Sequence, residues 1–461
     1  MKKYTLFLLS LTLVFSSCGL YSNYERKNVD QIMQNLYRDS VAAANALQAD
    51  TTSLGDRPWQ EVFTDPLLQR LIYTALEKNS DLRSADLTVR QAESGLRVSR
   101  LAFYPQISIG ANGTVSSWDF GKASKIYNFP LQASWQIDAF GTLRNAKKQS
   151  EVALEQTKVA RQATQTAIIA AVANLYYTLE MLDEQLATTK ATGEIWDKNV
   201  QAMELMKQAG YTYSAAVSQS KANYLTLLAS IPKLQASITS AENSLCALLH
   251  EAPHEIERGK LADASFPDEF SVGIPLQLLA ARPDVRIAEL QMAYAFYGVL
   301  GARGEFYPKL TLSGSGAWTN NSGMGLVNPG KILANAVASL VQPLFAQGKL
   351  KANLDIAKAQ QEDAQIKFEQ ALLNAGNEIS SALADYHALQ QKIETDKQLV
   401  GELTNTAEVT EFVFRNDNSV SYLETLVAQQ NLLQAQLNLI SDRFDLLQTG
   451  ITIYQALGGG R

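Results

Sequence analysis

The chain repeats itself, and this internal duplication constrains its fold more than any other feature. The segment 100–109 reads RLAFYPQISI and returns at 303–312 as RGEFYPKLTL, while 80–85 returns as 283–288 at the same spacing. In both halves a phenylalanine and a nearby glycine then precede a long stretch without proline. Each half is therefore predicted to form the same series: a helix, a Phe-Tyr-Pro corner, two strands, a glycine corner, a long helix and a return helix.

Alternation of apolar and polar residues predicts four strands, two in each half. The clearest lies at 127–138, where one face carries Tyr127, Phe129, Leu131, Ala133, Trp135 and Ile137. The fourth, around 334–341, alternates poorly. Strands of about ten residues with one apolar face and nearby Trp or Tyr are typical of a membrane β-barrel. A half-buried sheet in a soluble domain is the alternative.

Four strands cannot close a barrel, because an open edge is not tolerated in hydrocarbon. If these strands cross a membrane, several chains must therefore share one barrel. The pattern predicts an oligomer on this ground alone.

Two long helices are predicted at 142–208 and 349–415, which contain no proline. Each would measure roughly 100 Å if continuous. Alanines recur every seven residues in both, which favours closely packed, coiled-coil-like helices: Ala146, Ala153, Ala160 and Ala167, then Ala357, Ala364 and Ala371. Short polar links follow, and return helices are predicted at 214–250 and 420–457. The expected fold class is mainly α, with long antiparallel helical hairpins and a small β part.

The N-terminus is typical of an export signal. Lys2 and Lys3 precede the apolar run 6–15, and Cys18 follows. The position of Cys18 resembles a bacterial lipobox, which would make it the lipidated first residue of the mature chain. An ordinary signal peptide with an incidental cysteine is the alternative. The formal charge of −6 and the pI of about 5.4 exclude a basic surface for nucleic acid.

No catalytic constellation or cofactor site is predicted. Cys246, His250 and His254 are spaced four apart and could face one way on a helix, but Pro253 interrupts that helix. The glycines at 458–460 are expected to form a frayed tail and not a phosphate-binding loop. The chain is therefore predicted not to be an enzyme, with no metal site.

These residues resemble the TolC-like outer-membrane factors, specifically the efflux-pump lipoprotein (NodT-type) branch. The resemblance spans nearly everything after Cys18. It rests on five motifs: FYP at 103–105, WQIDAFGTLR at 135–144, RPDV at 282–285, QPLF at 342–345 and YLETL at 422–426.

The resemblance implies a homotrimer with a shared transmembrane β-barrel and a periplasmic α-helical barrel. It also implies two partners, a periplasmic adaptor protein and an inner-membrane pump, expected to be of the RND type. The chain would sit in the outer membrane of a Gram-negative bacterium, anchored in lipid at Cys18. The expected segments are a signal peptide (1–17), a lipid-anchored segment (18–64), a first repeat (65–255, hairpin 106–138), an equatorial connection (256–282) and a second repeat (283–461, hairpin 309–342).

The expected function is passive export of small molecules such as drugs or toxic compounds. By resemblance, the two helical hairpin tips form a periplasmic gate, and the matching residues here are Gly210, Tyr211, Ser214, Arg415, Asp417 and Tyr422. A solvated turn aspartate and a surface arginine are the alternatives for Asp417 and Arg415. An exported coiled-coil adaptor or scaffold is the alternative function, as is a duct for protein secretion or metal efflux.

Overall fold

The computed structural model describes residues 22–25, 57–117, 119–264, 266, 282–321, 326–416 and 421–460. Cys18 and Asp417 lie outside these residues. The chain divides into two compact units: unit 1 comprises Met1–Val29, Asp86–Ala160 and Arg286–Ala371, and unit 2 comprises Asp30–Ala85, Arg161–Val285 and Leu372–Arg461.

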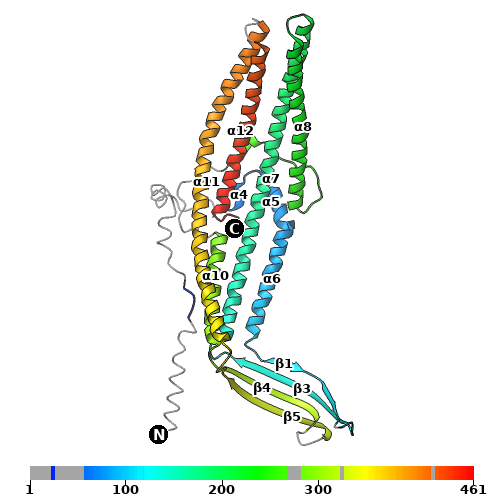
Figure 1. Cartoon of the computed structure of the whole chain (residues 1–461), viewed down its shortest axis with the longest axis vertical. Coiled ribbons are helices and arrows are strands. Elements are labelled where there is room, and N and C mark those ends of the chain that lie inside the picture. The colour runs from blue at the N-terminus through cyan, green and yellow to red at the C-terminus, as the bar shows by residue number, and fades with distance from the viewer. Residues whose placement is uncertain are drawn as a thin grey trace. The chain divides into compact units, whose positions relative to one another are not determined.

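The order of elements confirms the duplication (Figure 1). The first series is α6 (Ser80–Leu101), β1 (Gln106–Ile109), β2 (Asn112–Ser116), β3 (Ser124–Ile137), α7 (Thr142–Gln208) and α8 (Ser214–Leu248). The second is α10 (Pro283–Gly304), β4 (Lys309–Asn321), β5 (Leu326–Val341), α11 (Lys349–Asn416) and α12 (Tyr422–Ala456). The mainly helical class and the long hairpins are therefore also confirmed.

The first strand differs from the prediction because it is split into β1 and β2, which both pair with β3. Ile109 faces Leu131 and Asn112 faces Asn128, so the ladder is interrupted opposite Pro130. Pro130 has no N–H to donate, and its carbonyl oxygen accepts from the Gly110 N–H at 3.0 Å. The split is thus the local effect of one proline. The fourth strand also begins earlier than expected, at Leu326.

Two short helices, α4 (Trp59–Val62) and α5 (Pro66–Lys78), precede the first series. Asp65 caps α5, since its Oδ1 accepts from the Leu67 N–H at 2.8 Å, and Pro66 occupies the first turn. Their apolar side chains enter the core of unit 2, where Phe63, Leu68 and Ile72 are fully buried.

The glycine tail does not fray, so that expectation is wrong. Residues 457–460 are buried. Gly458 has a φ of +75° and ends α12, with the Gly459 N–H donating to the Tyr454 carbonyl at 3.1 Å. Thr166 Oγ1 donates to the Gly459 carbonyl at 2.6 Å, and the Gly460 N–H donates to Tyr454 Oη at 2.7 Å. The tail is therefore part of the unit 2 core.

Equivalent positions in the two halves hold the ends of the return helices. Asn79 Nδ2 donates to the carbonyl of Leu248, the last residue of α8, at 2.9 Å. Arg282, which the duplication aligns with Asn79, donates from Nη1 to the Ala456 carbonyl at the end of α12, also at 2.9 Å. Both side chains are buried. In each half, the residue just before the first helix thus holds the C-terminal end of the return helix.

Candidate functional site

The β-sheet of unit 1 has one apolar and one polar face. The strand order is β1-β3-β4-β5, all antiparallel, with β2 also on β3. The register places in one set of rows Ile107, Ala133, Gly314 and Ala336; Ile109, Leu131, Gly316 and Ala334; and Trp135, Leu312 and Ala338. The alternate rows contain Ser108, Gln132, Ser315 and Asn335, then Gln136, Thr311 and Ser339. In these rows, which run through β1, β3, β4 and β5, apolar and polar residues therefore alternate between the two faces.

The apolar face of the sheet is exposed in the single chain. Ile109 is 82% exposed, and Leu131 and Trp318 are more than half exposed. An apolar patch of this kind marks a surface that another molecule or a membrane covers. On β5 the apolar face carries small alanines, while Val337 lies on the other face, which explains why that strand alternates poorly in the sequence.

The two Phe-Tyr-Pro corners are stabilised in the same way. Trp135 Nε1 donates to the Phe103 carbonyl at 2.8 Å, and Gln342 Nε2 donates to the Phe306 carbonyl at 2.7 Å. Asp138 then caps α7, accepting from the Leu143 and Arg144 backbone N–H groups at 3.0 and 2.8 Å. The motifs that carry the family resemblance thus act mainly at the junctions between strand and helix.

The first hairpin tip turns at Gly210. Gly210 has a φ of +81°, its N–H donates to the Lys207 carbonyl at 3.1 Å, and the Tyr211 N–H donates to the Met206 carbonyl at 2.8 Å. This is a Schellman motif, in which the left-handed residue is usually glycine. The turn leaves Tyr211 75% exposed. Ser214 opens α8 directly after it.

The second tip begins α12 with a capping box. Ser421 Oγ accepts from the Glu424 N–H at 3.4 Å, and Glu424 Oε2 accepts from the Ser421 N–H at 2.8 Å. Arg415 lies in the last turn of α11, and its side chain is outside the described residues, as is Asp417. The structure therefore does not show the side chains of these two expected gate residues.

Tyr422 links the two hairpins near their tips, within unit 2. Its hydroxyl donates to Ser220 Oγ on α8 at 2.5 Å, and its ring packs against Phe414 on α11 with centroids 5.8 Å apart. Burial raises the pKa of the phenol, so it stays a donor at neutral pH. Ser220, which is 3% exposed, is not among the residues that the sequence pointed to. No sequence signal could have found it, because its partner is 202 residues away.

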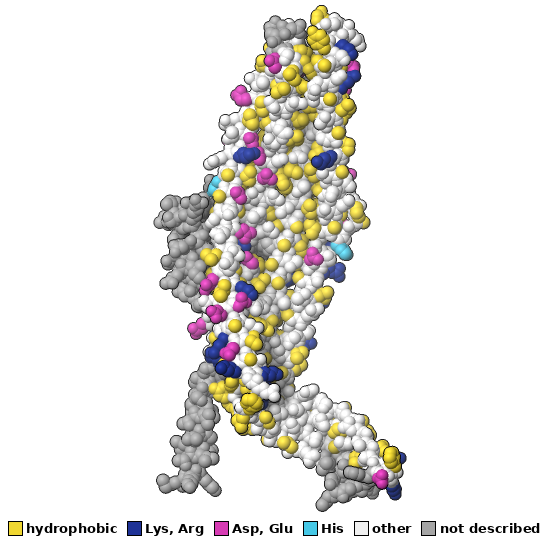
Figure 2. Space-filling view, viewed as in Figure 1, with side chains coloured by type: hydrophobic (Ala, Val, Ile, Leu, Met, Phe, Trp, Pro, Cys, Tyr) yellow, Lys and Arg dark blue, Asp and Glu magenta, His cyan; other side chains and the backbone are white. Residues whose placement is uncertain are grey.

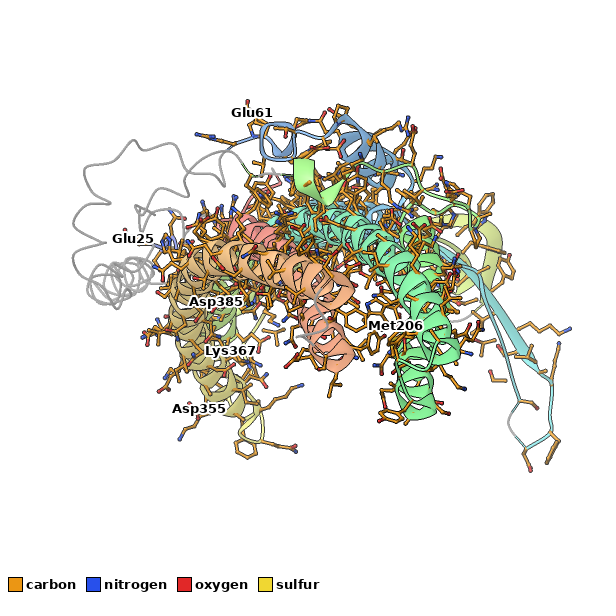
Figure 3. All side chains as sticks on the ribbon, turned by 90° about the horizontal axis from the view of Figure 1, so that it is seen from above. Glu25, Glu61, Met206, Asp355, Lys367 and Asp385 are labelled. Atoms are coloured by element: carbon orange, nitrogen blue, oxygen red, sulfur yellow. The ribbon has the colours of Figure 1, made fainter. Side chains whose placement is uncertain are left out.

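Further polar contacts tie the helices of unit 2 together behind the tips. Asn199 on α7 donates to Gln429 on α12 at 2.9 Å. Lys392 on α11 forms ion pairs with Asp396 on its own helix and with Asp442 on α12. Burial raises the pKa of Asp442, and the ion pair with Lys392 opposes that rise. Charged side chains also follow α11 on the face shown in Figure 2. Figure 3 labels three charged residues of this helix, Asp355, Lys367 and Asp385.

The spaced cysteine and histidines do not form a cluster on one helix face. Helix α8 ends at Leu248, and His250 follows it with a φ of +56°. Buried Cys246 has its Sγ 3.5 Å from His254 Nδ1. Over the described ranges, no three His, Cys, Asp or Glu side chains are placed to hold a metal ion. Nor does any helix in the described part of the chain combine the length and apolar character needed to cross a membrane.

A model of the outer membrane efflux protein family matches residues 71–250 and 274–459. The chain is 27% identical over 463 residues to SilC of Salmonella typhimurium, a probable outer membrane lipoprotein, covering 98% of each chain. It is 27% identical over 477 residues to TtgC of Pseudomonas putida, a toluene efflux pump outer membrane protein, covering 100% of this chain and 96% of TtgC.

The chain is also similar to CusC. It is 28% identical over 463 residues to the cation efflux system protein CusC of Escherichia coli, covering 98% of this chain and 97% of CusC. A solved CusC structure matches it with a TM-score of 0.82 at 26% identity, over 88% of this chain and 95% of that one. The duplicated hairpins and the sheet with one apolar and one polar face agree with these matches. The chain therefore belongs to the outer membrane efflux protein family, and it is a TolC-like outer-membrane channel of an efflux system.

Proposed function

We propose that three copies of the chain share one transmembrane β-barrel and one helical tunnel. The two faces of the sheet support this, since an apolar outer face and a polar inner face are what a membrane barrel requires. Among the described residues, β1 and β2 form one edge of the sheet and β5 forms the other. Each of these strands has a neighbour on one side only. Pairing β5 of one copy with β1 and β2 of the next removes every open edge.

The channel conducts passively and is completed by two partners, a periplasmic adaptor protein and an inner-membrane pump of the RND type. The adaptor binds the hairpin tips, where Tyr211 and Tyr213 offer exposed aromatic rings. Cys18 carries the lipid anchor. Tyr24, six residues further on, supports an anchor near the channel wall, because its backbone N–H donates to Tyr297 Oη of α10 at 3.3 Å.

The exported compounds are small molecules, including drugs and toxic compounds. The similar proteins divide between toluene efflux and cation efflux, so their names favour neither class. A path for soft metal ions would use exposed methionine sulfur. Met203 and Met292 are buried in the helix packing, at 1% and 8% exposure, whereas Met181 and Met206 are half-buried. No row of exposed methionines is therefore present among the described residues, and small organic molecules remain the proposed substrates.

The gate is formed by the two tips: Gly210, Tyr211 and Ser214 on one, and Arg415, Asp417 and Tyr422 on the other. The observation that carries this assignment is the hydrogen bond from Tyr422 to Ser220. It joins α12 to α8 across the two hairpins, beside the turn at which α11 ends. A gate that opens by separating the hairpins must break this bond.

Tyr422→Phe is therefore expected to favour the open channel. Each copy loses one net hydrogen bond, about 1 kcal/mol, which corresponds to roughly a fivefold increase in the open-to-closed ratio of its own tip. Single-channel recording in planar bilayers would measure the open fraction. Tyr213→Phe, which removes the hydroxyl of an exposed tip tyrosine, is the control and should leave the open fraction unchanged. An open fraction that Tyr422→Phe does not alter would rule out this bond as part of the gate.

Asp417→Ala is expected to weaken the preference of the channel for cations. Three symmetry-related carboxylates in a narrow mouth concentrate negative charge and favour cations there. Reversal potentials in a salt gradient would measure the selectivity, and Asp385→Ala, which removes an exposed aspartate of α11, is the control. If Asp417→Ala left both selectivity and conductance as they were, Asp417 would be a solvated turn residue and not part of the gate.

A further inference from the structure

Glu180 of α7 is a buried acidic residue that has no part in the β-sheet or in the hairpin tips. The residue is 2% exposed, and its Oε2 has no hydrogen-bond partner among the described residues. It lines a cavity of about 360 Å³, together with Asp65, Tyr177, Gly259, Lys260 and Asp263. A buried carboxylate oxygen without a hydrogen-bond partner is costly, because burial removes its hydration without supplying a donor.

Three elements of unit 2 meet at this carboxyl group: α7, the N-terminus of α5 and the segment 256–264 after α8. The Tyr176 hydroxyl donates to Asp65 and accepts from the Gly259 N–H at 2.9 Å. A Cβ atom at Gly259 would lie 3.0 Å from Glu180 Oε1 and 3.4 Å from Asp65 Oδ2. The glycine thus brings the backbone of the segment directly against both carboxyl groups.

The charged groups around Glu180 do not compensate an ionised carboxylate. Asp65 faces it from α5 and Asp263 from the segment, and both add negative charge. Arg258 is already paired with Asp183 at 2.5 Å and with Glu242 at 2.5 Å. Of the described residues that line the cavity, only Lys260 is a cation, and it is not among the groups that act on the pKa of Glu180. The phenols of Tyr176 and Tyr177 stay neutral, because burial raises the pKa of each.

We propose that Glu180 is a proton-binding site, and that its proton holds the segment 256–264 against α7 and α5. When protonated, Glu180 is neutral and can sit beside Asp65 and the Gly259 backbone. When it loses the proton, an unpaired charge is left in the same space. The segment must then move outward and admit water, which the adjoining cavity allows.

The direction of the pH dependence follows from the pKa of Glu180. Burial first, and then the charge of Asp65, raise this pKa to about 7, against a smaller lowering by the neighbouring Tyr176 hydroxyl. With the segment open and the carboxyl hydrated, the pKa returns toward its ordinary value near 4.5. The closed form therefore binds a proton that the open form releases between these values. Closure is strongest below pH 4.5, weakens as the pH rises toward about 7 and changes little above that value.

Hydrogen–deuterium exchange of the full-length protein in detergent, between pH 5.5 and 8.5, tests this proposal. After correction for the intrinsic pH dependence of amide exchange, opening of 256–264 should increase by roughly 30-fold across the range. The reason is that the opening equilibrium changes about tenfold for each pH unit between the pKa values of the open and closed forms. Glu180→Gln, which cannot ionise, should keep the segment protected at every pH. Glu194→Gln, at an exposed position on the same helix, should behave like the unaltered protein.

A second variant keeps the proposal testable if Glu180→Gln fails to fold. Asp65→Asn removes the neighbouring charge, lowers the pKa of the closed form and should make opening of the segment less dependent on pH. Equal protection of the segment at pH 5.5 and 8.5 in the unaltered protein would overturn the proposal. So would a transition that persists in Glu180→Gln. Restoration of protection at pH 8.5 by Ca²⁺ at about 5 mM, above the affinity range of extracellular sites, would show a cation site instead.

Discussion

Arg282→Ala is expected to lower the free energy of unfolding by about 2–4 kcal/mol, although Arg282 lies far from both the sheet and the tips in sequence. The Arg282 side chain is 9% exposed. It donates to both Asp284 carboxylate oxygens at 3.0 and 2.9 Å, to Glu378 on α11 at 2.6 Å and to the Ala456 carbonyl. Its removal breaks all of these contacts and takes away the donor to a buried carbonyl at the end of α12.

The control for Arg282 is another arginine. Arg70 pairs with Glu257 at 2.8 Å, but both side chains are more than half exposed. Such exposed pairs contribute little, so Arg70→Ala should change the stability by less than about 1 kcal/mol. Urea unfolding of the detergent-solubilised protein, followed by circular dichroism, would compare the two. Arg282→Lys should fall between them, because lysine keeps the charge but cannot bond to a carboxylate with two parallel N–H groups. Equal losses for Arg282→Ala and Arg70→Ala would refute the anchoring role of Arg282.

The second large effect is expected when a charge is placed on the apolar face of the sheet. Leu131→Arg should cost about 2–4 kcal/mol per chain if the residue lies near the bilayer midplane. Leu131 pairs with Ile109 on β1 and with Gly316 on β4, in the apolar rows. In a shared barrel the cost arises in every copy, so we expect little assembled channel in the outer membrane. Heat-modifiable mobility of the membrane fraction on gels would measure this.

The next residue along the same strand is the control. Gln132 lies on the polar face, opposite Ser108 and Ser315. Both Leu131 and Gln132 are exposed in the single chain, so neither substitution disturbs the packing within it. Gln132→Arg should therefore assemble normally and alter only ion selectivity. If the two variants assembled equally well, the apolar face would not be in contact with lipid.

The parts of the fold that could be predicted from the sequence are those with local signals. Helix α7 begins and ends where expected, because Gly141 and Asp138 mark its start and Gly210 its end. Helix α5 also has a local signal, the Asp65-Pro66 pair at its start, although no helix is among the predictions there. The split of the first strand could have been found only by pairing Gly110 with Pro130, which lies on a different strand.

The contacts that long-range packing creates were not predictable. The glycines at 458–460 are typical of a loose end, and they are ordered only because Thr166 and Tyr454 supply partners. Tyr422 is assigned to the tip by resemblance, whereas Ser220 emerges only from the structure. From the sequence alone, Glu180 is expected to lie on the helix surface like an ordinary glutamate. The residues that bury it come from α5 and from the segment after α8, which are distant in the sequence. A single sequence carries no record of such pairs.

The unpaired edge strands of the sheet have a genetic consequence. In the proposed trimer, β5 of each copy completes the sheet of the next, so no copy can finish its own barrel. Exposed strand edges also bind other strands indiscriminately, which makes unassembled chains prone to aggregation. A copy with a mutation in one edge strand can still pair with a second copy through its unaltered edge. The trimer then cannot close its barrel, and its two unaltered copies are inactive as well. Mutations at β1, β2 or β5 should consequently be dominant over the normal gene, whereas mutations confined to a helical core should be recessive.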